Sequence, residues 1–184
     1  QFTNQKYQNL QDDFHSDFDY TPTFRLAETP FFISKKLKSQ LIEGCNDVIK
    51  LIQQNEFNDL TDKALELNIK VPNQDKHTTF LAIDFGICEE NNEVVPKLIE
   101  VQGFPSLYNY QYILDQKLKK QYPFLNDLTP FCDGLTSDKY LSILEEVICN
   151  NHQNENVILL EIEPEKQNTI IDFYYCNREF GILV

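Results

Sequence analysis

Residues 80–112 read FLAIDFGICEENNEVVPKLIEVQGFPSLYNYQY, and the rest of the chain is organised around them. From Phe80 to Ile87, large apolar side chains alternate with small, polar or aromatic ones, which is the two-residue period of a β-strand. A return strand is expected at Lys97–Gln102, after a loop centred near Asn92. The pattern therefore predicts an antiparallel hairpin, followed by a turn and a helix.

This register sets polar side chains opposite one another across the hairpin. Asp84 pairs with Glu100 and Ala82 with Gln102, with cross-strand Cβ atoms roughly 4.5 to 5.5 Å apart. The simpler interpretation is the exposed polar face that many antiparallel hairpins have. However, like charges directly opposite destabilise a sheet unless a cation lies between them, and Mg²⁺ takes oxygen ligands of this kind. Asp84, Glu100 and Gln102 are therefore candidate metal ligands.

The hairpin residues also resemble a known family. The run D-F, a turn, then P-K-L-I-E-V-Q-G-F-P-S-L-Y is similar to the metal-binding hairpin of glutathionylspermidine synthase and its circularly permuted ATP-grasp relatives. Those proteins have an R-x-D-F strand, a K-L-L-E-x-N strand and a T-P-T-S-L-Y-E segment. The resemblance implies that Asp84, Glu100 and Gln102 hold the Mg²⁺ that bridges ATP and an acyl-phosphate. It also implies that Ser106 lies near the substrate.

The activity implied by this resemblance is that of an ATP-dependent ligase, which joins a carboxylate to an amine of a small molecule or peptide. Ala82 departs from the family pattern, because those enzymes have a phosphate-contacting arginine at that position. The departure favours an alternative, a non-catalytic binding module or structural interaction domain that keeps the fold. In the family, the ATP-clamping lysines and the adenine pocket come from sequence that would follow Val184 of this chain. The chain is therefore expected to be an N-terminal fragment that is inactive alone.

The last part of the chain predicts a βαβ unit. Val157–Ile162 is almost continuously apolar, typical of a strand covered on both faces. Ile170–Phe180 is expected to be a helix ended by Gly181, and Ile182–Val184 to begin another strand. This order resembles the start of the Rossmann-like pre-ATP-grasp domain of the same family.

Four further segments are expected to be helices: Ser34–Gln53, Leu60–Leu67, Ser106 to about Lys120, and Thr136–Cys149. Ser34 and Ser106 are suitable N-caps for the first and third, because a serine hydroxyl accepts hydrogen bonds from free N–H groups. Thr136 or Ser137 caps the fourth. The predicted fold is α/β, or α+β, with a helical arm and metal-side hairpin over residues 1–135 and an incomplete second domain over 136–184.

Two groups of charged residues are interpreted as solvated. Gln1–Thr29 is expected to be a polar arm that lies on the body through its aromatic rings, without a firm helix. The aspartates around His15 match no metal-ligand spacing and are taken as a solvated acidic segment. Lys117, Lys119 and Lys120 are expected to complement the dipole of their helix at its carboxyl end.

Composition limits the classes of protein to which the chain can belong. At 184 residues and 41% hydrophobic it is long and apolar enough for a packed core. Its formal charge of −13 speaks against binding to nucleic acids or anionic membranes. Its five cysteines are odd in number and form no C-x-x-C pair, and no apolar run reaches the roughly 20 residues of a membrane span. We therefore expect a cytoplasmic protein with reduced thiols. The absence of Met indicates a fragment or a processed chain.

Overall fold

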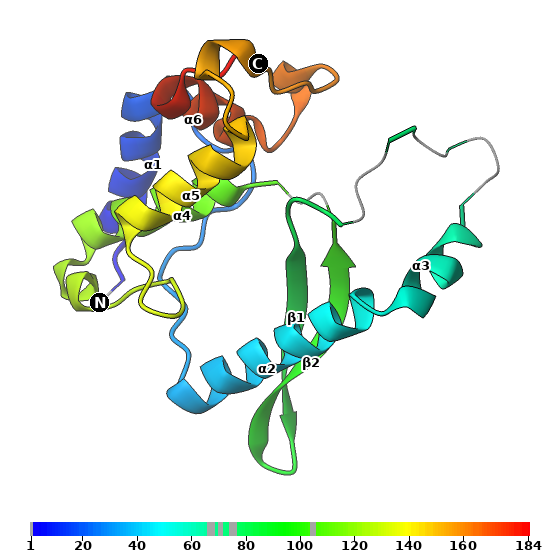
Figure 1. The fold of residues 1–184 in the computed structure, drawn as a ribbon. Helices are drawn as coiled ribbons and strands as arrows, with labels where there is room; N and C mark the ends of the chain where they lie inside the picture. The colour runs from blue at the N-terminus through cyan, green and yellow to red at the C-terminus, as the bar shows by residue number, and fades with distance from the viewer. Residues whose placement is uncertain (1, 66–68, 70–71, 74–76, 104–105) are drawn as a thin grey trace. The chain divides into compact units, whose positions relative to one another are not determined.

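The computed structural model describes residues 2–65, 69, 72–73, 77–103 and 106–184. Helices and one antiparallel sheet are both present, which confirms the α+β class (Figure 1). The chain divides into two compact units. The helical unit is Gln1–Pro30 with Ser106–Val184, and the hairpin unit is Phe31–Pro105. These units do not coincide with the domain boundary expected at residue 135.

The hairpin unit begins with a helix that is confirmed in both extent and cap. Helix α2 is Lys35–Ile52, and the Ser34 hydroxyl accepts a hydrogen bond from the backbone N–H of Leu37 at 3.1 Å. Gly44 allows this helix to lie close to the sheet, because a Cβ there would be 3.0 Å from the ring of Phe85. Helix α2 therefore covers the face of the hairpin that carries Phe85.

Helix α3 is displaced from its predicted position. It is Asn55–Asp62, whereas the sequence predicts a helix over Leu60–Leu67, of which residues 66–68 lie outside the described residues. Its N-cap residue, Gln54, makes no side-chain hydrogen bond to the helix. The start of this helix therefore lacks the capping side chain by which sequence reasoning finds a helix N-terminus.

The hairpin itself is confirmed. Strand β1, Ala82–Glu90, pairs with strand β2, Glu93–Gln102, in the antiparallel sense. Asn91 and Asn92 form the loop, with φ angles of 53° and 60°. Asparagine tolerates this left-handed conformation, and a two-residue hairpin turn of the tightest kind requires it at both positions.

The helical unit consists of four α-helices and three short 3₁₀ turns within the described residues: α1 (Asn4–Phe18), α4 (Tyr108–Gln121), η1 (Pro123–Asp127), α5 (Ser137–Cys149), η2 (Asn154–Asn156), η3 (Pro164–Lys166) and α6 (Ile170–Phe180). The predicted extents of α5 and α6 are confirmed. The Thr136 hydroxyl accepts from the N–H of Lys139 at 3.3 Å, and Gly181 ends α6 with a φ of 65°.

Helix α1 corrects the expectation of an arm without a firm helix. Its two innermost side chains, Leu10 and Phe14, are 1% and 0% exposed, and Phe14 stacks on Tyr110 of α4 with ring centroids 6.0 Å apart. Only these two side chains of α1 are classed as buried. Because most other positions are polar, the apolar stripe is too narrow to stand out in the sequence.

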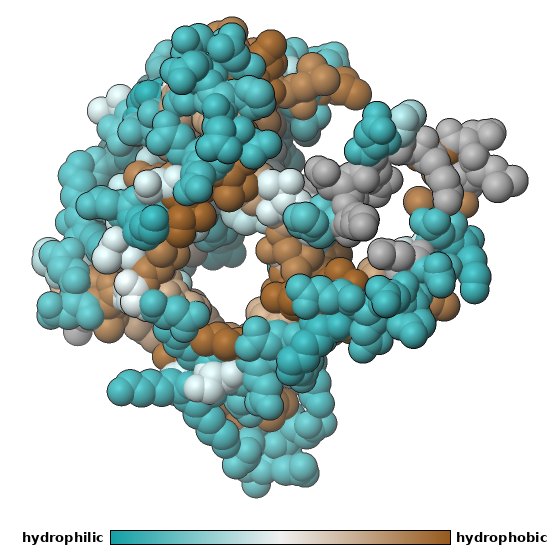
Figure 2. Space-filling view, in the orientation of Figure 1, coloured by the Kyte–Doolittle hydropathy of each residue, from teal (hydrophilic) through white to brown (hydrophobic). Residues whose placement is uncertain are grey.

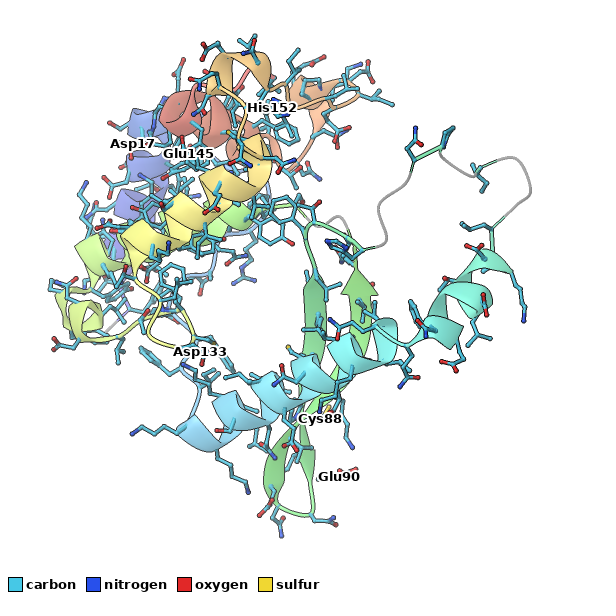
Figure 3. The ribbon with its side chains drawn as sticks, viewed as in Figure 1. Asp17, Cys88, Glu90, Asp133, Glu145 and His152 are labelled. Atoms are coloured by element: carbon cyan, nitrogen blue, oxygen red, sulfur yellow. The ribbon has the colours of Figure 1, made fainter. Side chains whose placement is uncertain are left out.

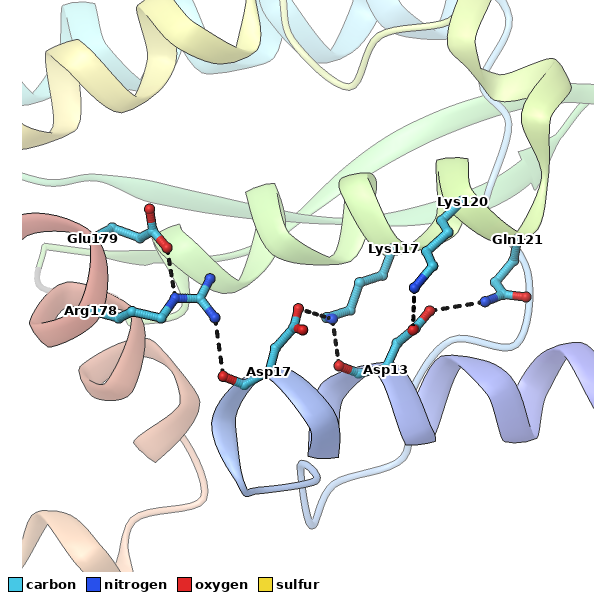
Figure 4. A network of polar contacts seen from close by, with 7 residues as sticks. All are labelled: Asp13, Asp17, Lys117, Lys120, Gln121, Arg178 and Glu179. Atoms are coloured by element: carbon cyan, nitrogen blue, oxygen red, sulfur yellow. Dashed lines mark hydrogen bonds and ion pairs between the residues drawn. The ribbon is translucent and has the colours of Figure 1, made fainter.

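Burial of Lys117, near the end of α4, corrects the expectation that its charge is solvated. The side chain of Lys117 is 7% exposed, and its Nζ donates to Asp17 Oδ2 at 2.6 Å and to the backbone carbonyl of Asp13 at 2.7 Å (Figure 4). Lys120 pairs with the carboxylate of Asp13, and Lys119 with Asp115 at 2.8 Å. These lysines are therefore ion-pair partners, two of them to α1, and not simply solvated charges.

The predicted strand at Val157–Ile162 is largely wrong. Within the described part of the chain, this segment forms one parallel bridge, between Ile158 and Leu183, and the N–H of Leu159 donates to the carbonyl of Leu183 at 2.8 Å. Leu160 is 91% exposed, so this segment is not covered on both faces. An apolar surface lies over this segment in Figure 2.

Four of the cysteines are confirmed as free thiols. Cys149 and Cys176 are buried, whereas Cys88 and Cys132 are exposed. Among the helices that the structure describes, none is long and apolar enough to cross a membrane.

Candidate functional site

The predicted cross-strand pairs are present in the structure. Asp84 pairs with Glu100, and Ala82 pairs with Gln102. Side chains of directly paired residues lie on the same face of a sheet, so the two carboxylates and the carboxamide share one face. Because Asp84 and Phe85 are neighbours in β1, this face is opposite the one that α2 covers. All three candidate ligands are exposed.

A β-bulge beside Asp84 changes the expected pattern of faces. The register shifts between Asp84 and Phe85, so that Phe85 pairs with Leu98 and Ile99 is the extra residue. Leu98 therefore shares the face of Phe85, and not the face of Glu100 as alternation predicts. A Cβ at Gly86 would lie 3.5 Å from Cδ1 of Ile99, which places Ile99 on the face of Asp84. Bulges of this kind re-aim side chains next to functional sites.

The charges of Asp84 and Glu100 are not neutralised within the chain as the structure describes it. Gln102 Nε2 donates a hydrogen bond to Glu100 Oε1, and neither Asp84 nor Glu100 forms an ion pair with a described residue. Two lysines of the hairpin unit, Lys97 on β2 and Lys36 on α2, have other partners. Lys97 pairs with Glu90 and Lys36 with Glu93, each at 2.9 Å.

The donor atoms of this face fit a hard divalent cation. Two carboxylates and a carboxamide offer only oxygen ligands once the Gln102 amide nitrogen is engaged with Glu100. Among the described residues, no group of three or more His, Cys, Asp or Glu side chains is placed to hold a metal ion. A cation bound by Asp84, Glu100 and Gln102 therefore needs further ligands from water or a substrate.

Thr78 closes the open end of the hairpin next to this site. Its hydroxyl lies 2.7 Å from the carbonyl oxygen of Phe80 and also contacts the carbonyl of Gly103. These two carbonyls flank the Ala82–Gln102 pair in the sequence. No sequence pattern pointed to Thr78, because its partners are set by the pairing of the two strands.

Farther along β1, the hairpin carries an exposed thiol and a paired carboxylate toward the loop, at Cys88 and Glu90 (Figure 3). Both are an even number of residues from Asp84 along the strand, so their side chains lie on the same face of the sheet as that of Asp84. The carboxylate of Glu90 is committed to Lys97. The candidate ligands are therefore confined to the end of the hairpin away from the loop.

The predicted substrate residue, Ser106, belongs to the helical unit. It does not cap α4 as expected. The N-cap residue is Leu107, with a left-handed φ of 69° and no side-chain hydrogen bond to the helix. Ser106 is exposed and lies immediately before this residue.

Asp172 of α6 takes the capping role instead. Its Oδ1 accepts a hydrogen bond from the N–H of Tyr110 at 2.7 Å, and its carboxylate also interacts with the backbone N–H groups of Leu107, Tyr108 and Asn109. Burial raises the pKa of Asp172 to about 6, although these four N–H groups act to lower it. Sequence reasoning missed this residue, because nothing in the pattern of α6 indicates that its first turn faces the start of another helix.

The residues around Asp172 are uncharged, and they are buried (Asn109, Cys176) or half-buried (Tyr108, Tyr140). Asn109 Nδ2 donates to Cys176 Sγ at 3.0 Å, and the Tyr140 hydroxyl donates to the carbonyl of Tyr108 at 2.9 Å. Burial raises the pKa of Cys176 to about 11 and that of Tyr140 to about 12. Neither group therefore ionises near neutral pH, and this cluster has no activated nucleophile.

No family model matches this chain, and neither does a curated protein or a solved structure.

Proposed function

We propose that this chain supplies the metal-side hairpin of an ATP-dependent carboxylate–amine ligase, of the glutathionylspermidine synthase-like, circularly permuted ATP-grasp kind. The observation that carries the proposal is the cross-strand pair of Asp84 and Glu100, with no cationic side chain of the described residues paired to either. A sheet tolerates such a pair best when a cation binds to it. The partners are a carboxylate and an amine, with Mg²⁺ and ATP as cofactors.

Each hairpin residue has a distinct part in this proposal. Asp84 and Glu100 supply the negative charge that attracts Mg²⁺, and the Gln102 carboxamide holds the Glu100 carboxylate through its amide nitrogen. Bound there, Mg²⁺ would neutralise phosphate charge during formation of an acyl-phosphate. Ser106 is the proposed substrate contact, on the basis of the sequence resemblance.

A non-catalytic binding module is the second candidate function. Ala82, paired with Gln102 at the edge of the site, stands where the resembling enzymes have a phosphate-contacting arginine. A module without that arginine binds Mg²⁺ but binds the phosphates of ATP more weakly. If this candidate is right, the protein binds Mg-ATP without releasing ADP, and Ala82→Arg strengthens nucleotide binding without creating turnover.

The first experiment tests the metal site directly. Mn²⁺ is titrated into the ¹⁵N-labelled protein, and paramagnetic broadening of backbone amide signals is measured by NMR. Broadening is expected first at residues 82–86 and 99–102, and to disappear in Asp84→Asn and Glu100→Gln. Glu89→Gln is the matched control, because Glu89 lies on the same strand but on the opposite face. Broadening centred elsewhere, or unchanged in Glu100→Gln, contradicts the metal assignment.

The second experiment tests the reaction. ADP release by the full-length protein is measured with pools of carboxylates and amines, each omitted in turn. A ligase requires both, whereas a simple ATPase requires neither. If release depends on both and persists unchanged in Glu100→Ala, the ligase stands but its metal ligands lie elsewhere.

A further inference from the structure

The first turn of α4 has more hydrogen-bond donors than its own sequence can satisfy. The first N–H groups of a helix have no partner within the helix, and a capping side chain normally accepts from one or two of them. Here the N-cap residue is Leu107, which has no acceptor in its side chain. Ser106, which does have one, makes no capping hydrogen bond.

Asp172 satisfies these donors from outside the helix. It is 7% exposed and accepts from Tyr110 N at 2.7 Å, and the N–H groups of the three preceding residues act to lower its pKa. The positive end of the helix dipole also favours the ionised carboxylate, but together with the N–H groups it offsets only part of the cost of burying the charge. Among the described residues, the Asp172 carboxylate accepts from a backbone N–H of this turn, whereas Tyr140 donates to the carbonyl of Tyr108 and Cys176 accepts from the side chain of Asn109.

Among the residues that the structure describes, no cation of the surrounding elements compensates the charge of Asp172. The titratable groups that face it are Tyr108 on α4, Tyr140 on α5 and Cys176 on α6, and all three are neutral near pH 7. The charged groups on the other elements packed against α6 are committed elsewhere: Asp17 of α1 to Lys117, and Lys166 of η3 to Glu163.

We propose that Asp172 is a positioning residue whose protonation state controls how firmly the start of α4, and with it Ser106, is held. The importance of Ser106 for substrate rests on the proposed function, but the control of α4 by Asp172 does not. When the first turn of α4 separates from α6, Asp172 becomes solvated and its proton affinity returns to that of an ordinary aspartate. Proton binding therefore favours the closed, anchored turn.

The direction of the effect follows from this difference. The closed turn has Asp172 with a pKa of about 6, and the open turn has the ordinary value of 3.8. Between these values, raising the pH favours the open turn, because only the open form has lost its proton. The opening equilibrium is expected to increase up to roughly 100-fold from pH 3.5 to pH 7 and to level off above that.

Amide hydrogen exchange tests the proposal. Protection factors of Leu107–Tyr110 are measured by NMR from pH 4 to pH 7, after correction for the intrinsic pH dependence of exchange. In the wild-type protein they are expected to fall as the pH rises, by tens of fold over this range. Asp172→Asn keeps an acceptor oxygen but cannot titrate, so its protection factors stay constant. Asp138→Asn, in the exposed first turn of α5, is the control and is expected to behave as wild type.

A chemical-shift titration covers the case in which Asp172→Asn fails to fold. In the wild-type protein, the Asp172 carboxyl carbon and the Ser106 amide are expected to titrate together with a midpoint near 6. A carboxyl midpoint near 4, a Ser106 signal without that midpoint, or the same pH slope in Asp172→Asn overturns the proposal. Neither measurement uses metal or nucleotide, so each outcome is independent of the ligase proposal.

Discussion

Lys117 Nζ lies 2.6 Å from Asp17 Oδ2, although the two residues are 100 positions apart in the sequence. The ammonium is almost completely buried, at 7% side-chain exposure, whereas the carboxylate is about half exposed. The same ammonium lies 5.0 Å from the centroid of the Phe14 ring, the most deeply buried aromatic side chain of α1. The pair therefore connects the polar edge of α1 to the core between α1 and α4.

Lys117→Met is expected to destabilise the protein by about 2 kcal/mol, because it removes two hydrogen bonds from a charged, buried donor while keeping most of the apolar stem. Lys120→Met is the control. That lysine also pairs with α1 but is 68% exposed, so its loss is expected to cost clearly less than the loss of Lys117. Urea unfolding followed by circular dichroism measures both. Equal losses would show that burial of Lys117 does not determine the strength of its contacts.

The pH dependence of stability is expected to differ between two aspartates. The hydrogen bond from Lys117 lowers the pKa of Asp17, so its contribution is present above the unfolded value of 3.8 and is lost as the pH falls below it. Burial raises the pKa of Asp172, so its contribution is complete below 3.8 and is lost as the pH rises to about 6. From the difference of about two pKa units, Asp172 removes about 3 kcal/mol between pH 3.5 and pH 7.

Asp172→Asn therefore flattens the stability profile in this interval. Unfolding free energies of wild type and variant are measured in urea at half-unit steps of pH. The difference between the two proteins is expected to change in favour of the variant as the pH rises from 4 to 6. A difference that is constant across these steps contradicts a raised pKa in the folded state.

Gly181 ends α6 in the left-handed conformation, with open space around the position that a Cβ would occupy. Gly181→Ala is expected to cost about 1 kcal/mol through backbone strain alone. Gly181→Asn is expected to cost less, because asparagine tolerates this region better than alanine. Thermal unfolding ranks the two variants. If alanine is as stable as asparagine, strain is not the cause of the loss.

Two aliphatic residues near the Ile158–Leu183 bridge are expected to differ in how much their truncation changes stability. Leu160 is 91% exposed and Ile182 is 0% exposed. Leu160→Ala is expected to change stability by less than about 0.5 kcal/mol. Ile182→Ala leaves a cavity beside α6 and is expected to cost about 2 to 5 kcal/mol. A loss in Leu160→Ala comparable to that in Ile182→Ala would show that Leu160 is covered in solution.

Local sequence signals predicted the parts of the fold that depend on local interactions. The hairpin register follows from alternation and a two-residue Asn-Asn loop, and the ends of three helices follow from Ser34, Thr136 and Gly181. In each case the deciding partner is a few residues away or directly across a tight turn. The pairing of Asp84 with Glu100 belongs to this group, which is why the candidate ligands could be placed together from the sequence.

The features that sequence reasoning missed depend on partners far along the chain. The cap of α4 comes from Asp172, 62 residues after Tyr110, and Lys117 is buried only because α1 packs against it. The bulge at Ile99 adds one residue to a strand without any change in its apolar pattern. Whether Leu160 is covered depends on what packs against it, and a continuous apolar run does not carry that information.

The helical unit consists of two segments separated by the whole hairpin unit. During synthesis, β1 and β2 can pair as soon as the residues around their two-residue loop have emerged, because their contacts are local. Helix α1 is made first but finds its partners on α4 and α6 last, since Arg178 of α6 donates to the carbonyl of Asp17 from 161 residues away. Helix α1 therefore cannot complete its packing until these later helices have been synthesised, and Phe14 gains its contact with Tyr110 only once α4 has formed.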